Sequence, residues 1–154
     1  MILSILTFSF CITFCSFIIG MICTAMVKNT KLYTHKLSNL NFIKSDRLNN
    51  VLGVSFVRWM VRNTFFKFLN PTLKFNRSSN ILDLQNIRKL MTKAETDHLF
   101  AFCFVLIIVL IVVLKGKYTL GFVLLICNIL MNLCPSLLQQ QNKRRIDKLI
   151  SRYI

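Results

Sequence analysis

An acidic residue and a histidine, Glu95 and His98, stand three positions apart where a charged segment meets a long apolar run. Side chains at this spacing share one face of a helix. A histidine near a carboxylate can take a proton from an alcohol, while the acid orients or charges the ring. The pair therefore fits the base of a group-transfer reaction, and it fits equally well an ion pair at a membrane surface.

A second set of polar residues follows the next apolar run and consists of amides and an arginine: Asn132, Gln139, Asn142 and Arg145. Asn132 and Gln139 are seven positions apart, so they share one face of a helix about two turns apart. Amides and an arginine can bind a sugar or a phosphate. The alternative is that they hydrogen-bond between helices and only hold them together.

A helical hairpin over residues 94–154 would bring the two sets together. Its apolar runs, 99–114 and 118–138, are joined by the short turn Lys115-Gly116-Lys117. A run of about 20 apolar residues spans a bilayer. The first run is shorter, and it reaches that length if His98 and Lys115 lie at the two interfaces.

Folding this hairpin about Gly116 brings His98 level with Cys134, which lies between Asn132 and Gln139. The two polar sets can then meet in one layer near one membrane surface. The rotation of each helix about its own axis decides whether they do, and the sequence leaves that rotation open. Pro135 removes a backbone hydrogen bond, so we expect a kink in the last helix.

Residues 1–27 form a third apolar run, which we expect to be a retained transmembrane helix with its N-terminus outside. The run lacks the positive n-region of a secretory signal peptide and is about twice as long as the usual apolar core of one. Small residues at Gly20 and Ala25 leave cleavage open as the alternative.

Lys and Arg number 20 against 5 Asp and Glu, and they flank the apolar runs. This placement favours contact with anionic lipid headgroups over nucleic acid, for which no binding motif is visible. Positive residues gather in segment 28–93 and in the tail, which the positive-inside tendency places in the cytoplasm. The hairpin turn would then lie outside.

Within this basic segment, Val51–Leu69 alternates aromatic residues with Arg58 and Arg62, which is typical of a helix in the headgroup plane. Asn70-Pro71 should end that helix. Ser79 or Asn80 could cap a further helix that runs, without Pro or Gly, into the second span. The expected fold is an all-α membrane protein: an N-terminal span, a cytoplasmic or interfacial helical segment, and a C-terminal helical hairpin.

All 6 cysteines lie inside the apolar runs, and neither a CxxC pair nor a Cys/His pairing at zinc spacing occurs. Cysteine in such places usually acts as a small apolar residue. We therefore expect no disulfide, no metal site and no cofactor.

The two polar blocks resemble the motifs of a family of small bacterial membrane proteins, the glycosyl-4,4'-diaponeurosporenoate acyltransferases. The first block is matched by Ala94, Glu95 and His98, and the second by Asn132, Gln139, Asn142, Lys143, Arg145 and Ile146. The resemblance implies a membrane acyltransferase that esterifies a sugar hydroxyl of a carotenoid- or isoprenoid-type glycolipid. His98 would be the base with Glu95 as its partner, and substrate would be bound by Asn132, Gln139, Asn142 and Arg145.

An acyl-CoA-type donor would have to be recognised by basic residues such as Arg88, Lys89 and Lys143. The resemblance also implies the bacterial plasma membrane, where hydropathy and the positive-inside tendency predict a multi-pass protein with a cytoplasmic C-terminus. Two other functions stay open: a non-catalytic lipid-binding or assembly subunit, and a transporter or pore subunit that would need an oligomer.

Overall fold

The computed structural model describes residues 2–64 and 80–153, and every regular element in these ranges is helical. Short helices lie in the described part of the basic segment, as the sequence predicts, and three long helical rods make up the other described parts of the chain. The elements are α1 (Ile2–Val27), α2 (Lys31–His35), η1 (Leu37–Asn39), α3 (Asp46–Val51), α4 (Val54–Asn63), α6 (Ile81–Leu114), α7 (Tyr118–Asn128), the π-helical segment η3 (Ile129–Leu133) and α8 (Cys134–Ile150).

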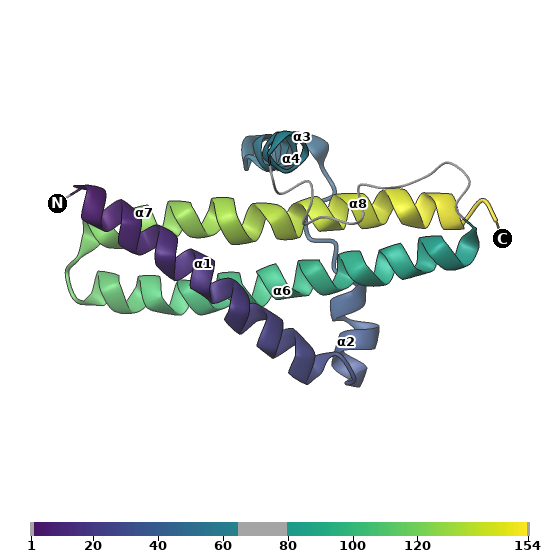
Figure 1. Cartoon of the computed structure of the whole chain (residues 1–154), viewed down its shortest axis with the longest axis horizontal. Helices are drawn as coiled ribbons and strands as arrows, with labels where there is room; N and C mark the ends of the chain where they lie inside the picture. The colour runs from purple at the N-terminus through teal and green to yellow at the C-terminus, as the bar shows by residue number, and fades with distance from the viewer. Residues whose placement is uncertain (1, 65–79, 154) are drawn as a thin grey trace.

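The predicted hairpin is confirmed. Helix α6 runs antiparallel to the rod formed by α7, η3 and α8, and α1 lies diagonally across α6 (Figure 1). Gly116 makes the tight turn with a φ of 73°, a left-handed conformation that glycine adopts without a steric penalty. Three helical stretches are long and apolar enough to cross a membrane, as predicted, and the protein is a membrane protein.

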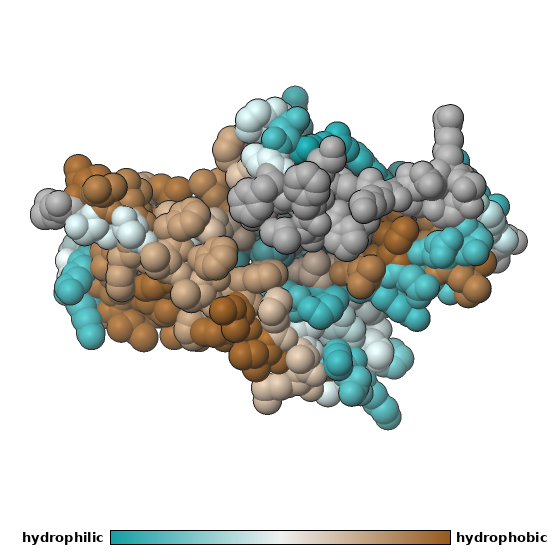
Figure 2. Space-filling model, viewed as in Figure 1, coloured by the Kyte–Doolittle hydropathy of each residue, from teal (hydrophilic) through white to brown (hydrophobic). Residues whose placement is uncertain are grey.

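The hairpin is longer than a bilayer is thick. Helix α6 has 34 residues, and at 1.5 Å per residue it extends about 51 Å, against a hydrocarbon core of about 30 Å. Figure 2 shows mostly apolar side chains over the half that holds the turn, whereas hydrophilic side chains gather over the other half with some apolar ones among them. The Asn80 side chain caps α6 by accepting a hydrogen bond from the Asp83 N–H at 2.9 Å. The far ends of α6 and α8 therefore form a polar extension beyond the membrane.

Helix α1 packs on α6 through small and hydroxyl side chains. Its buried residues are Ser9, Thr13, Ser16, Gly20 and Thr24. A Cβ added at Gly20 would lie 2.0 Å from the backbone oxygen of Asp97, so the two backbones are in direct contact there. Small residues that let backbones approach closely are typical of helix packing within membranes.

Substituting Gly20 by alanine is expected to force α1 away from α6, because backbone atoms cannot move aside as a flexible side chain can. Overpacking of this kind costs about 1–3 kcal/mol. Thermal unfolding of the purified protein in detergent would measure the loss. Met21→Ala, at an exposed position on the same helix, is the matched control, and equal unfolding midpoints for the two variants would contradict this packing.

Pro135 lies two residues beyond the end of the π-helical segment, in the first turn of α8. There the N–H of Cys134 bonds the carbonyl of Ile129, five residues back, instead of the usual four. A π turn and a proline are both recognised causes of local distortion in a helix. The sequence predicts the disturbance as a kink; in the structure the helix changes its hydrogen-bonding pattern just before Pro135.

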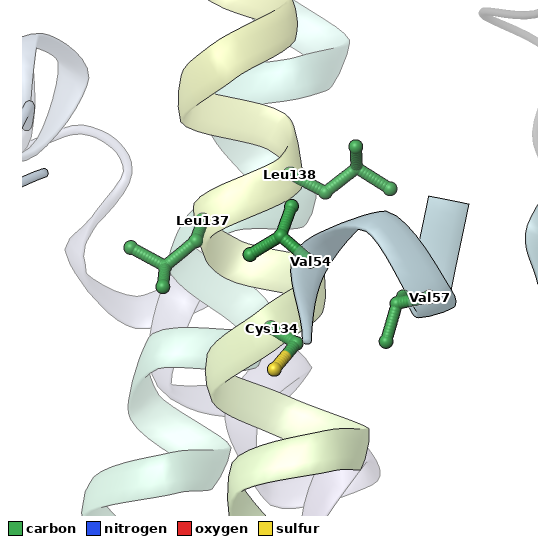
Figure 3. Close-up of a cluster of buried hydrophobic side chains, with 5 residues drawn as sticks. All are labelled: Val54, Val57, Cys134, Leu137 and Leu138. Carbon is green, nitrogen blue, oxygen red and sulfur yellow. The ribbon is translucent and has the colours of Figure 1, made fainter. Parts of the chain in front are cut away.

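The predicted basic helix over residues 51–69 corresponds to α4, which begins after Gly53 (φ 87°) and ends at Asn63, where the C-cap Thr64 is extended. The prediction of one continuous helix is therefore wrong beyond Asn63, and its expected end at Asn70-Pro71 lies outside the described residues. Helix α4 crosses the long axis of α8 (Figure 1). Figure 3 shows how Val54 and Val57 lie against α8, where they form a buried cluster with Cys134, Leu137 and Leu138. The orientation across the hairpin agrees with a helix in the headgroup plane.

Candidate active site

The imidazole of His98 lies where three elements meet. A side-chain hydrogen bond links it to Asn132 in η3, and the ring of Phe17 in α1 lies 4.8 Å away between centroids. Its Nδ1 is buried and has no hydrogen-bond partner among the described residues. A ring nitrogen without a protein partner can act as a general base once an alcohol comes within hydrogen-bond reach of it.

Asn132 is held by hydrogen bonds to two elements. Its Nδ2 donates to Ser16 Oγ at 3.1 Å and to Asn128 Oδ1 at 2.9 Å. Asn128 in turn donates to the backbone oxygen of Phe102 at 3.0 Å. Both asparagines are almost completely buried. Polar side chains at such depth are stable only with partners, so this network fixes the amide beside the imidazole.

Glu95 interacts with α8 instead of with His98. Its carboxylate is fully buried and forms an ion pair with Lys143, whose side chain is only 3% exposed. The Lys143 ammonium also donates to the backbone oxygen of Ser38 at 3.0 Å. Among the described residues no hydrogen bond or ion pair joins Glu95 to His98. The spacing of the two residues on α6 is as predicted, but their side chains have different partners.

The remaining predicted site residues lie further along α8. Gln139 is buried, and its Oε1 has no hydrogen-bond partner within the described ranges. Asn142 is partly buried and Arg145 is exposed. Helical rise places Asn142 about 15 Å beyond Asn132 along the axis. The described contacts therefore bring Asn132 to His98 and leave Gln139, Asn142 and Arg145 apart from the imidazole.

Several side chains in this region have no counterpart among the predicted site residues. Ser16 and Phe17 come from α1, whose small residues recur at helical spacing, and that recurrence is a signal for a packed face. Tyr33 of α2 hydrogen-bonds Thr96, the residue that follows Glu95, and burial raises the pKa of its phenol. The hydroxyl of Tyr33 thus keeps its proton at neutral pH.

Metal ligands do not gather at this site. In the part of the chain that the structure describes, no group of three or more His, Cys, Asp or Glu side chains could hold a metal ion. The absence of a cofactor stays a prediction. The chemistry considered below uses only the side chains of this chain.

A comparison with protein families places these residues in context. The model of the family described as glycosyl-4,4'-diaponeurosporenoate acyltransferase matches residues 29–152 of the 154 in the chain. The chain belongs to this family. The resemblance seen in the sequence is thereby confirmed. Comparisons with curated proteins and with solved structures gave no match.

The matched range of this glycosyl-4,4'-diaponeurosporenoate acyltransferase family member includes His98, Asn132 and the Glu95–Lys143 pair. It does not include α1, which supplies Ser16 and Phe17. The site as folded therefore draws on more of the chain than the family model covers.

Proposed function

We propose that the protein is a membrane acyltransferase that esterifies a sugar hydroxyl of a carotenoid- or isoprenoid-type glycolipid, with His98 as the general base. The observation that supports this most is the partly buried imidazole, held beside Asn132, whose Nδ1 has no hydrogen-bond partner among the described residues, in a member of an acyltransferase family. An imidazole so placed can accept the proton of an alcohol as that alcohol becomes a nucleophile.

The depth of His98 suits such an acceptor. Sixteen apolar residues separate it from the turn, Leu99–Leu114, and they extend about 24 Å, most of the thickness of the hydrocarbon core. The imidazole then lies near the border between lipid and water. A glycolipid with a polyisoprenoid tail holds its sugar at that border, so its hydroxyls can reach the ring.

The proposed reaction needs no atoms beyond acceptor and donor. As His98 takes the hydroxyl proton, the sugar oxygen attacks the carbonyl carbon of an acyl thioester and a C–O ester bond forms. The C–S bond breaks, and the thiolate leaves and takes up the proton. Asn132 is a positioning residue that holds the imidazole, and the free Oε1 of Gln139 is an acceptor for a further sugar hydroxyl.

In this proposal Glu95, Asn142 and Arg145 do not contact the reacting atoms. Because its carboxylate is bound to Lys143, Glu95 acts on His98 by fixing α6 against α8. Asn142 and Arg145, which lie toward the water on α8, would contact the more distant part of the sugar. These roles follow the expected site residues, with positions taken from the fold.

A second function is favoured by one observation. The interhelical Glu95–Lys143 pair is the kind of contact expected of a non-catalytic lipid-binding or assembly subunit. In that case the buried polar side chains would only hold the helices together, and the protein would catalyse no reaction on a lipid.

Lipid analysis separates the two functions. The chain would be expressed in cells that make a glycosylated carotenoid, and extracts from cells with and without it would be compared by mass spectrometry. The expected result is a new species heavier than the glycolipid by one acyl group. Identical extracts, with the protein shown to be in the membrane, would leave the subunit function as the better account.

A further inference from the structure

A small polar pocket lies in the half of the hairpin that is away from the turn, and His98 is not among its lining residues. It has a volume of about 90 Å³ and is formed by the chain after α2, by α6 and by α8, with the lining residues Asn39, Leu40, Asn41, Arg88, Gln140, Lys143, Arg144 and Asp147. A volume of this size holds several water molecules. It is large enough for one phosphate group.

The cations around the pocket differ in how they are neutralised. Arg88 pairs with Asp147 at 2.5 Å, and Lys143 pairs with Glu95. Among the described residues Arg144 has only neutral partners: its Nη1 donates to Asn41 Oδ1 at 2.7 Å and to the backbone oxygen of Ile43 at 3.1 Å. Its Nη2 is buried and has no partner among the described residues. The pocket thus contains one guanidinium with a donor to spare and an uncompensated charge.

These features define the chemistry of the occupant. A buried N–H without an acceptor is costly, so a bound oxygen would relieve it. The planar fork of arginine matches the oxygens of a phosphate group. Three cations against two carboxylates around the pocket leave an excess positive charge that favours an anion. A phosphate group meets each of these requirements.

We propose that this pocket binds a phosphate group of a coenzyme-A-type acyl donor, an inference that rests on the proposed function. The lining residues of α8 lie 8 to 15 positions beyond Asn132, which is about 12–22 Å along the helix. In a phospholipid the acyl carbonyl is close to the phosphate, so that donor cannot place one at His98 and the other here. In an acyl-CoA the pantetheine arm separates thioester and phosphates.

The test measures binding without turnover. The full chain, in nanodiscs of phosphatidylcholine, would be titrated with radiolabelled coenzyme A in equilibrium dialysis. Arg144→Gln is expected to weaken binding about tenfold or more, the loss typical of a charged hydrogen bond. Lys148→Gln, which removes a charge from an exposed position on the same helix, should stay within about twofold. Pantetheine, which has no phosphate, should not compete, whereas inorganic phosphate should.

The more conservative variant Arg144→Lys provides a second test in case Arg144→Gln fails to fold. It keeps the charge but loses the fork, so weaker coenzyme A binding is again expected. Equal weakening by Arg144→Gln and Lys148→Gln would show a general charge effect and overturn the pocket. Displacement of coenzyme A by phosphatidylglycerol added to the nanodiscs would overturn the assignment to the donor, because a lipid phosphate would then be the occupant.

The pocket and the proposed function can fail separately. Coenzyme A binding that depends on Arg144, in a chain that makes no acylated lipid, would refute the function and leave a phosphate site. If the protein makes acylated lipid but its affinity for coenzyme A does not depend on Arg144, the proposed phosphate pocket is refuted and the proposed function is not.

Discussion

Replacing His98 by alanine will remove acyl transfer while the protein remains folded in the membrane. Loss of a general base lowers the rate by about 10²–10⁴-fold, because no other group accepts the hydroxyl proton. The acylated glycolipid in cell extracts, quantified by mass spectrometry, gives the readout. The chain has 2 histidines, and His35→Ala, at an exposed position of α2, is the matched control.

The outcome of this comparison is decisive for the base. Normal product from His98→Ala, with the variant present at wild-type levels in the membrane, would exclude His98 from that role. Equal losses in the two histidine variants would point to a defect in insertion or stability. Only a loss confined to His98 fits the geometry around Nδ1.

Replacing Glu95 by leucine will strongly destabilise the protein. The change leaves the Lys143 ammonium, which is almost completely buried, without its counter-charge. Breaking a buried ion pair on one side costs about 3–5 kcal/mol, whereas replacing both partners by apolar residues is often neutral. The double variant Glu95→Leu with Lys143→Met should therefore recover most of the loss.

Denaturant unfolding in detergent, followed by circular dichroism, would measure these differences. The control variant Asp147→Asn breaks the ion pair of Asp147 with Arg88. The side chains of Arg88 and Asp147 are 27% and 46% exposed, so this change should cost about 1 kcal/mol or less. If the double variant were as unstable as Glu95→Leu alone, the cost would arise from lost packing or hydrogen bonds and not from an unpaired charge.

Local patterns predicted the hairpin well. The Lys115-Gly116-Lys117 turn, the Asn80 cap and the lack of any Pro or Gly up to Leu114 fix α6 and its antiparallel partner. Counting residues from the turn puts His98 level with Cys134, two residues from Asn132, and the side chains of His98 and Asn132 are in contact. Helix rise is nearly constant, so levels within a hairpin can be predicted from the sequence alone.

Other parts of the site depend on contacts that spacing does not determine. Glu95 and His98 share a face of α6, yet the carboxylate meets Lys143, a long side chain from the neighbouring helix. Which of two partners an acid meets depends on the rotation of α8. The π turn at Ile129–Leu133 changes that rotation, and its hydrogen bonds leave no sequence signal beyond the proline that follows.

The contribution of α1 does not follow from the length or the hydropathy of its apolar run. On a hydropathy scale Ser16 and Gly20 are only the less apolar residues of that run. In the folded chain they are the positions at which α1 meets Asn132 and the backbone of α6. A run that is uniformly apolar still has a packing face, and its small residues mark it.

Because α1 lies outside the range of the family model, a fragment of residues 28–154 would be a natural choice for expression. Such a fragment would lack the ring that covers His98 and the hydroxyl that accepts from Asn132. It would also present the backbone around Asp97 to lipid. Helix α1 covers one side of the His98 imidazole. Substitutions in α1 could therefore widen or narrow the path of the acceptor to His98 without changing the residues proposed to transfer the proton.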